Sequence, residues 1–129
     1  MPKSGVIKNY TRREAVAPFK IITSNYSDDE NYYIKLVDSR TDRVAETIFV
    51  RSGDTVEVKV PVGSYKIRYA TGHKWYGEED LFGHDTSYAK SNELLVFSYS
   101  GYYVSGMSLT LYKTRNGNFA TNPMKAEDF

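Results

Sequence analysis

An alternation of apolar and polar residues over positions 55–69 constrains the fold of this chain more than any other stretch. Valines at 56, 58 and 60 alternate with polar residues, and the apolar positions then continue at Tyr65, Ile67 and Tyr69. A period of two places one side of a strand in a core and the other in water. Pro61-Val62-Gly63 separates the two runs with the residue types of a tight turn. The stretch therefore predicts a β-hairpin and an all-β fold.

Other short runs of strand character are separated by polar or glycine-containing turns. The predicted strands lie at residues 6–10, 19–23, 32–37, 44–51, 94–99 and 104–113, and the last two form a second hairpin near Ser100-Gly101. A turn at Asn116-Gly117 precedes a last short strand that ends at Phe119. No stretch of ten or more residues has the helical apolar period. We therefore expect a single antiparallel β-sandwich of about seven strands, with a small barrel as the alternative.

A chain of 129 residues corresponds to one domain, so residues 1–129 are expected to fold as a unit. Residues 1–17 are predicted to be an N-terminal arm and residues 121–129 a loose tail. Between two strong strand regions, residues 71–92 form one long loop with the single Trp and both His residues. Loops of that length are uncommon in compact domains and are often functional.

The composition excludes several classes of function. The chain has no Cys, which rules out disulfides, zinc-thiolate sites and cysteine nucleophiles. Its formal net charge of +1, with acids and bases intermixed, gives no electrostatic drive toward nucleic acid or an anionic membrane. No segment is apolar over a length that spans a bilayer or forms a leader, so a complete chain would be cytoplasmic.

The long loop is the predicted binding site because aromatic side chains contribute much of the energy of interfaces. Its predicted contact residues are Trp75, Tyr76, Phe82, Tyr88, Glu78, Glu79, His84 and Asp85. The aromatic residues would anchor a protein partner, or they would form a platform for a sugar whose hydroxyls bond to the carboxylates. The alternative is that Trp75 plugs the open end of the sandwich.

Two catalytic interpretations of the same loop are weaker. His73 to Asp85 contains six His, Asp and Glu residues, but their spacing matches neither H-E-x-x-H nor a calcium loop, so no metal is expected. Asp85-Thr86-Ser87 is similar to the aspartic protease signature, but Gly83-His84 precede it where that signature has apolar residues. No phosphate loop or nucleophile elbow occurs. We therefore expect a protein without a cofactor that is not an enzyme, and a small metal- or carboxylate-dependent hydrolase is the catalytic alternative.

Two resemblances are found, the first over about a third of the chain and the second over most of it. Residues 58–67 and the strand-turn-strand of residues 37–44 resemble transthyretin-like and carboxypeptidase-regulatory-like β-sandwich domains, which implies a non-catalytic module that packs against or presents other domains. A second set of segments is similar to the C-terminal module of uncharacterised bacterial or bacteriophage proteins, a likeness that implies a source but no activity. Those segments are residues 33–38, 47–51, 75–79, 81–83, 85–86 and 116–118. Together, the residues and the resemblances predict a non-catalytic protein-binding module that uses the loop or a sheet edge.

Overall fold

The fold is seen in a computed structural model that describes residues 2–11, 13–23, 30–91, 94–101, 103–111, 121–123 and 129. Within these ranges the regular elements are β1 (Gly5–Asn9), β2 (Ala17–Thr23), β3 (Asn31–Asp38), β4 (Val44–Val50), β5 (Thr55–Val60), β6 (Gly63–Gly72), the 3-10 helix η1 (Gly83–Asp85), β7 (Ser87–Ser91), β8 (Leu95–Phe97), β9 (Tyr99–Ser100), β10 (Tyr103–Val104), β11 (Met107–Leu111) and β12 (Thr121–Pro123). The prediction of an all-β sandwich is confirmed. The turn at Asn116-Gly117 and the strand ending at Phe119 fall outside the described residues.

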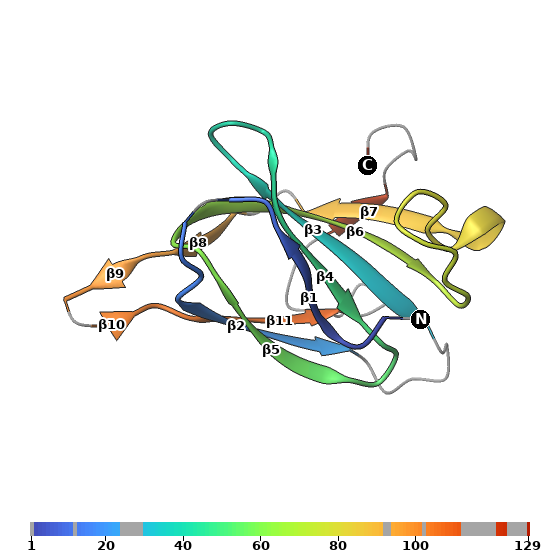
Figure 1. Ribbon diagram of the computed structural model, residues 1–129, viewed down its shortest axis with the longest axis horizontal. Helices are drawn as coiled ribbons and strands as arrows, with labels where there is room; N and C mark the ends of the chain where they lie inside the picture. Colours follow the sequence, from blue (N-terminus) through green and yellow to red (C-terminus); the bar gives the residue numbers. More distant parts are fainter. Residues whose placement is uncertain are drawn as a thin grey trace.

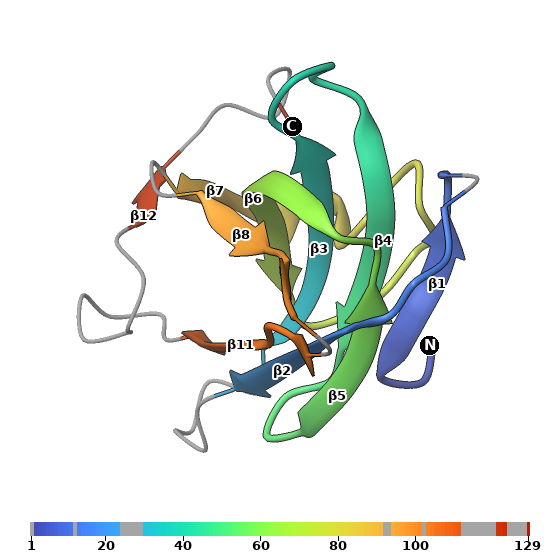
Figure 2. The ribbon, with the colours of Figure 1, turned by 90° about the vertical axis from the view of Figure 1, so that its left-hand side faces the viewer.

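Two sheets form the body of the molecule. The larger has the order β1-β4-β3-β6-β7-β12, with β8 also paired to β6, and the smaller has the order β11-β2-β5 (Figures 1 and 2). Their facing sides enclose the inner core, which includes Phe19, Ile34, Tyr65 and Leu109. One pair departs from the predicted antiparallel arrangement, because β11 runs parallel to β2 from Met107↔Phe19 to Leu111↔Thr23.

The segments β5 and β6 are strands, but the predicted hairpin between them is wrong. β5 pairs with β2 in the small sheet, whereas β6 pairs with β3, β7 and β8 in the large sheet. Pro61 and Val62 therefore carry the chain from one sheet to the other. Val60 and Tyr65 are both fully buried and meet the same inner core from opposite sheets. Alternation defines the buried face of each strand, but it does not specify the partner strand.

The second predicted hairpin exists only at its tip. Tyr103 pairs with Ser100, and Val104 with Tyr99, around Gly101, whose φ of 62° suits glycine. Beyond this tip the two arms diverge, since β8 joins the large sheet and β11 joins the small one. The β9–β10 hairpin projects from one end of the body (Figure 1).

Three predicted irregular regions are partly regular. The loop is shorter than residues 71–92, because β6 continues to Gly72 and β7 occupies Ser87–Ser91. The N-terminal arm contributes β1, which pairs with β4, and β2 already begins at Ala17. In the tail, β12 pairs with β7. β1, β7 and β12 have three to five residues each, and hydrogen bonds to a neighbouring strand hold them in extended form.

The central strands of the large sheet are buried on both faces. β4 is buried at six successive positions from Ala45 to Val50, without the alternation of a strand that has one wet face. The outer face carries a second cluster, here called the outer cluster. Its buried members are Tyr33, Phe49, Ala70, Leu81 and Phe82, and Ile7, Trp75, Tyr88 and Phe129 pack against them. The loop of residues 73–86 therefore covers the outside of the large sheet.

Candidate functional site

The loop of residues 73–86 is held in shape by its own backbone. The Tyr76 amide donates to the Leu81 carbonyl, and the Leu81 amide donates to the Gly77 carbonyl, each at 2.7 Å. The Thr86 hydroxyl accepts from the Phe82 amide at 3.0 Å and donates to the Gly83 carbonyl at 2.8 Å. Leu81 has a φ of 54°, which is uncommon for a bulky residue. Its side chain is buried in the outer cluster, and that packing accounts for the conformation.

Trp75 and Phe82, two of the predicted binding residues, point toward the sheet. The Trp75 ring centroid lies 5.0 Å from that of Phe49 and 5.3 Å from those of Tyr33 and Phe82. Phe82 is only 2% exposed. Trp75 therefore covers the outer face of the large sheet, a position that differs from both the sandwich plug and the exposed platform.

The other two predicted aromatic residues differ in exposure. Tyr88 is half-buried, and its ring centroid lies 5.3 Å from that of Phe129. Tyr76 is 55% exposed and lies against Gly83, where an added β-carbon would be 3.1 Å from the Tyr76 ring. Of the four predicted aromatic anchors, Tyr76 alone is largely open to a partner.

The predicted polar residues of the loop are not drawn together. Glu78 accepts a hydrogen bond from the Tyr33 hydroxyl at 3.0 Å, and burial together with this bond raises the pKa of Tyr33 well above its usual range. Glu79 and His84 are exposed, and the side chain of Asp85 is outside the described set. Within the described part of the chain, no three His, Asp or Glu side chains are grouped as metal ligands. Glu78 therefore links the loop to the large sheet through its hydrogen bond with Tyr33.

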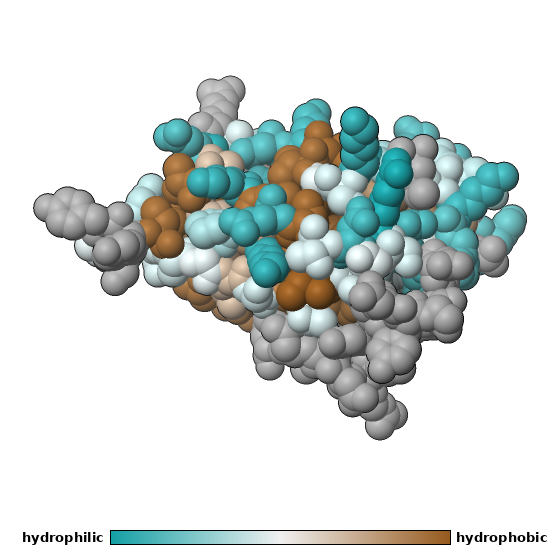
Figure 3. Space-filling model, turned by 90° about the horizontal axis from the view of Figure 1, so that it is seen from below, coloured by the Kyte–Doolittle hydropathy of each residue, from teal (hydrophilic) through white to brown (hydrophobic). Residues whose placement is uncertain are grey.

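An exposed apolar strip lies elsewhere, where β8 leads into the projecting hairpin. Leu94, Val96 and Tyr99 are 49%, 50% and 64% exposed, while Leu95 and Phe97 between them are buried. Figure 3 shows hydrophobic side chains beside the projecting hairpin at this end of the molecule. The signal in the sequence is the run Leu94-Leu95-Val96-Phe97, which has too many apolar residues for a strand with one wet face.

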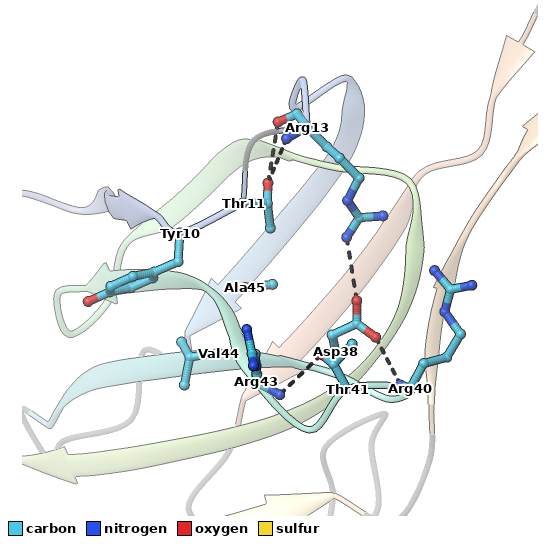
Figure 4. Close-up of a pocket in the computed structure, with 9 residues that line it drawn as sticks. All are labelled: Tyr10, Thr11, Arg13, Asp38, Arg40, Thr41, Arg43, Val44 and Ala45. Atoms are coloured by element: carbon cyan, nitrogen blue, oxygen red, sulfur yellow. Dashed lines mark hydrogen bonds and ion pairs between the residues drawn. The ribbon is translucent and has the colours of Figure 1, made fainter.

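A pocket that the sequence analysis did not predict lies between the β1–β2 connection and the β3–β4 turn (Figure 4). Its volume is about 280 Å³. Its lining consists of Tyr10, Thr11, Arg13, Asp38, Arg40, Thr41, Arg43, Val44 and Ala45. These arginines are spread through the sequence among acidic residues, and only the fold brings them to one place.

Among the described residues, one carboxyl group points into the inner core, that of Glu46. Glu46 is paired with Leu36 across β4 and β3, so both side chains point into the inner core, and Glu46 is 1% exposed. Neither carboxyl oxygen has a hydrogen-bond partner among the described residues. Burial raises the pKa of Glu46 to about 7. An uncharged carboxylic acid is therefore the stable form of this side chain over much of the acidic pH range.

None of the described segments is a helix with the length and apolar character needed to cross a bilayer. In comparisons with known proteins, no family model, no curated protein and no solved structure matched the chain. Both resemblances found in the sequence therefore stay predictions, and the function proposed below is argued from the exposed side chains of this chain.

Proposed function

We propose that this chain is a non-catalytic β-sandwich module that binds a protein partner through the apolar strip of Leu94, Val96 and Tyr99. The observation behind the proposal is that these three large apolar side chains, within six consecutive residues, are each 49% or more exposed. A large apolar side chain left in water costs free energy that association recovers. The neighbouring β9–β10 hairpin extends beyond the body, where a partner can reach both of its sides (Figure 1).

This location refines the prediction that a partner binds the loop or a sheet edge. Phe82 is buried and Trp75 is half-buried in the outer cluster, so much of their surface is already covered within the fold. The strip includes Val96 of β8, a strand whose pairing among the described strands is with β6 alone. Carbohydrate binding and hydrolysis at the loop remain alternatives from the sequence, without a structural observation that favours either of them.

The test is capture of partners from a bacterial lysate on the immobilised full chain, with quantitative identification of the proteins retained. A strip variant, Leu94→Ser with Val96→Ser and Tyr99→Ser, is compared with the loop variant Tyr76→Ser. These positions are exposed, so both variants are expected to fold. We expect the strip variant to lose the retained proteins and the loop variant to keep them. Retention of the same proteins by both variants would contradict the proposal.

A further inference from the structure

The pocket between the β1–β2 connection and the β3–β4 turn carries a local excess of positive charge. Three guanidinium groups, of Arg13, Arg40 and Arg43, line it together with one carboxylate, that of Asp38. Among the described lining residues the formal charge is therefore +2, in a chain whose total is +1. The chain as a whole does not attract anions strongly, so this charge is a property of the pocket.

Asp38 and Arg13 form a fixed polar base for the pocket. Arg13 donates to the Val62 carbonyl at 2.7 Å and lies 3.5 Å from an Asp38 carboxylate oxygen. The other Asp38 oxygen accepts from the Arg40 amide at 2.8 Å. Asp38 is the only acidic residue among the described lining residues, and both of its oxygens are thus occupied, so it leaves the guanidinium groups of Arg40 and Arg43 uncompensated.

Arg40 and Arg43 have exposed side chains that make no ion pair or hydrogen bond with any other described residue. The nearby Asp42 carboxylate is paired instead with Lys66 at 3.4 Å and Arg68 at 3.8 Å. The turn that carries both arginines is closed by the bond from the Asp38 amide to the Arg43 carbonyl and by that from the Asp42 amide to the Asp38 carbonyl, both 2.8 Å. Figure 4 shows the Arg13 guanidinium above the Asp38 carboxylate, the Arg40 side chain to its right and the Arg43 side chain to its left.

We propose that this pocket binds a small dianion, either a phosphate ester or a dicarboxylate. Planar guanidinium groups match the oxygens of phosphate and carboxylate through paired, charge-assisted hydrogen bonds. Two negative charges balance the lining. The volume of about 280 Å³ lies at the small end of ligand pockets, so it suits a small molecule. The half-buried Val44 and the buried Ala45 supply apolar surface for the carbon part of the ligand.

The test is calorimetric titration of the full chain with inorganic phosphate and, separately, with succinate, against chloride at equal ionic strength. A pH of about 8 lies above the second pKa of inorganic phosphate, so most of the phosphate is dianionic. The double variant Arg40→Gln/Arg43→Gln is compared with Lys20→Gln/Lys59→Gln, which removes the same charge from exposed positions of the small sheet. Circular dichroism and the thermal midpoint without ligand establish that both variants fold.

We expect at least one of the two dianions to bind the wild type, and the arginine variant to weaken that binding by roughly tenfold or more. The lysine variant should bind as the wild type does. Which anion binds distinguishes a phosphate ligand from a dicarboxylate ligand. Heats that do not exceed those of chloride for either dianion would overturn the proposal, as would an equal loss of affinity in the two double variants.

Discussion

The two apolar clusters on either side of the large sheet differ in how they are built. The inner core lies between two sheets, and strands from widely separated parts of the chain contribute to it. The outer cluster is closed by one loop, residues 73–86, and by Phe129. Burial between paired strands is coupled to the whole fold, whereas burial under a loop can be lost locally. Truncating an equally buried side chain in each cluster should therefore lower the free energy of unfolding by different amounts.

The largest effect on stability is expected when one buried phenylalanine is truncated in each cluster and the two losses are compared. Phe19 is fully buried, with its ring edge-on to Phe97 at 5.5 Å, and Phe19→Ala should lower the free energy of unfolding by about 3–5 kcal/mol. Phe82→Ala should cost roughly 1–2 kcal/mol, because the loop can open while the sandwich persists. Chemical denaturation followed by dichroism measures both values. Equal losses would show that the outer cluster is part of a single cooperative core.

The second prediction concerns Glu46, the polar residue of the inner core. Its folded-state pKa of about 7 is above the ordinary value of 4.5, so the folded protein holds this proton more tightly than the unfolded chain does. The stability contributed by Glu46 is therefore greatest below pH 4.5 and falls as the pH rises to about 7, by about 3 kcal/mol in total.

The comparison that isolates this effect is unfolding of the wild type and Glu46→Gln across that pH range. The variant cannot ionise at this position, so we expect its stability relative to the wild type to increase with pH and then level off above pH 7. Glu57→Gln, at an exposed position of β5, is the matched control and should track the wild type. A difference between Glu46→Gln and the wild type that does not change with pH would refute the assignment.

A third variant targets the contact between sheet and loop. A β-carbon at Gly72 would overlap Cβ and Cγ of Phe82, so Gly72→Ala must displace Phe82 together with the backbone that carries it, at a cost of about 1–3 kcal/mol. Because Trp75 packs on Phe82, its fluorescence emission should shift to the red and become easier to quench. Ser87→Ala, at an exposed position of β7, should leave the emission unchanged. Wild-type emission in Gly72→Ala would mean that the loop does not pack as described.

The smallest effect is expected from loss of the hydrogen bond between Tyr33 and Glu78, which links the outer cluster to the loop. Tyr33→Phe keeps the ring and removes the hydroxyl that donates to Glu78, which should cost about 1–2 kcal/mol. The loss should appear as faster proteolysis within residues 73–86, with little change in global unfolding. Tyr76→Phe removes an exposed hydroxyl and is the control. Proteolysis at the wild-type rate in Tyr33→Phe would show that this bond does not hold the loop.

Period-two alternation was enough to find most of the inner core. The apolar positions of the run over 55–69, namely Val58, Val60, Tyr65, Ile67 and Tyr69, are all in it, and Val56 packs against it. The same pattern could not predict which strands pair. A strand such as β5 has the same apolar face whichever strand is hydrogen-bonded to its edge. Pro61-Val62-Gly63 has the composition of a hairpin turn, and the chain uses it to pass between sheets.

The candidate sites were less predictable. Trp75 and Phe82 have the residue types of a binding surface, but their burial depends on Tyr33 and Phe49, which are distant in the sequence. The apolar run at 94–97 lies in a predicted strand. Which of its side chains remain exposed to solvent depends on neighbouring segments that the local sequence does not specify. Arg13 and Arg43 are thirty residues apart, and their local sequences do not predict that they line the same pocket.

The amino-acid order by itself determined that this chain forms β-strands and which side of most strands is apolar, because these depend on neighbours within a few residues. Only the tertiary structure decided which strands pair, which aromatic side chains remain exposed and which charges meet. Those outcomes depend on packing between segments far apart along the chain, where the free energy of one residue is set by what covers it.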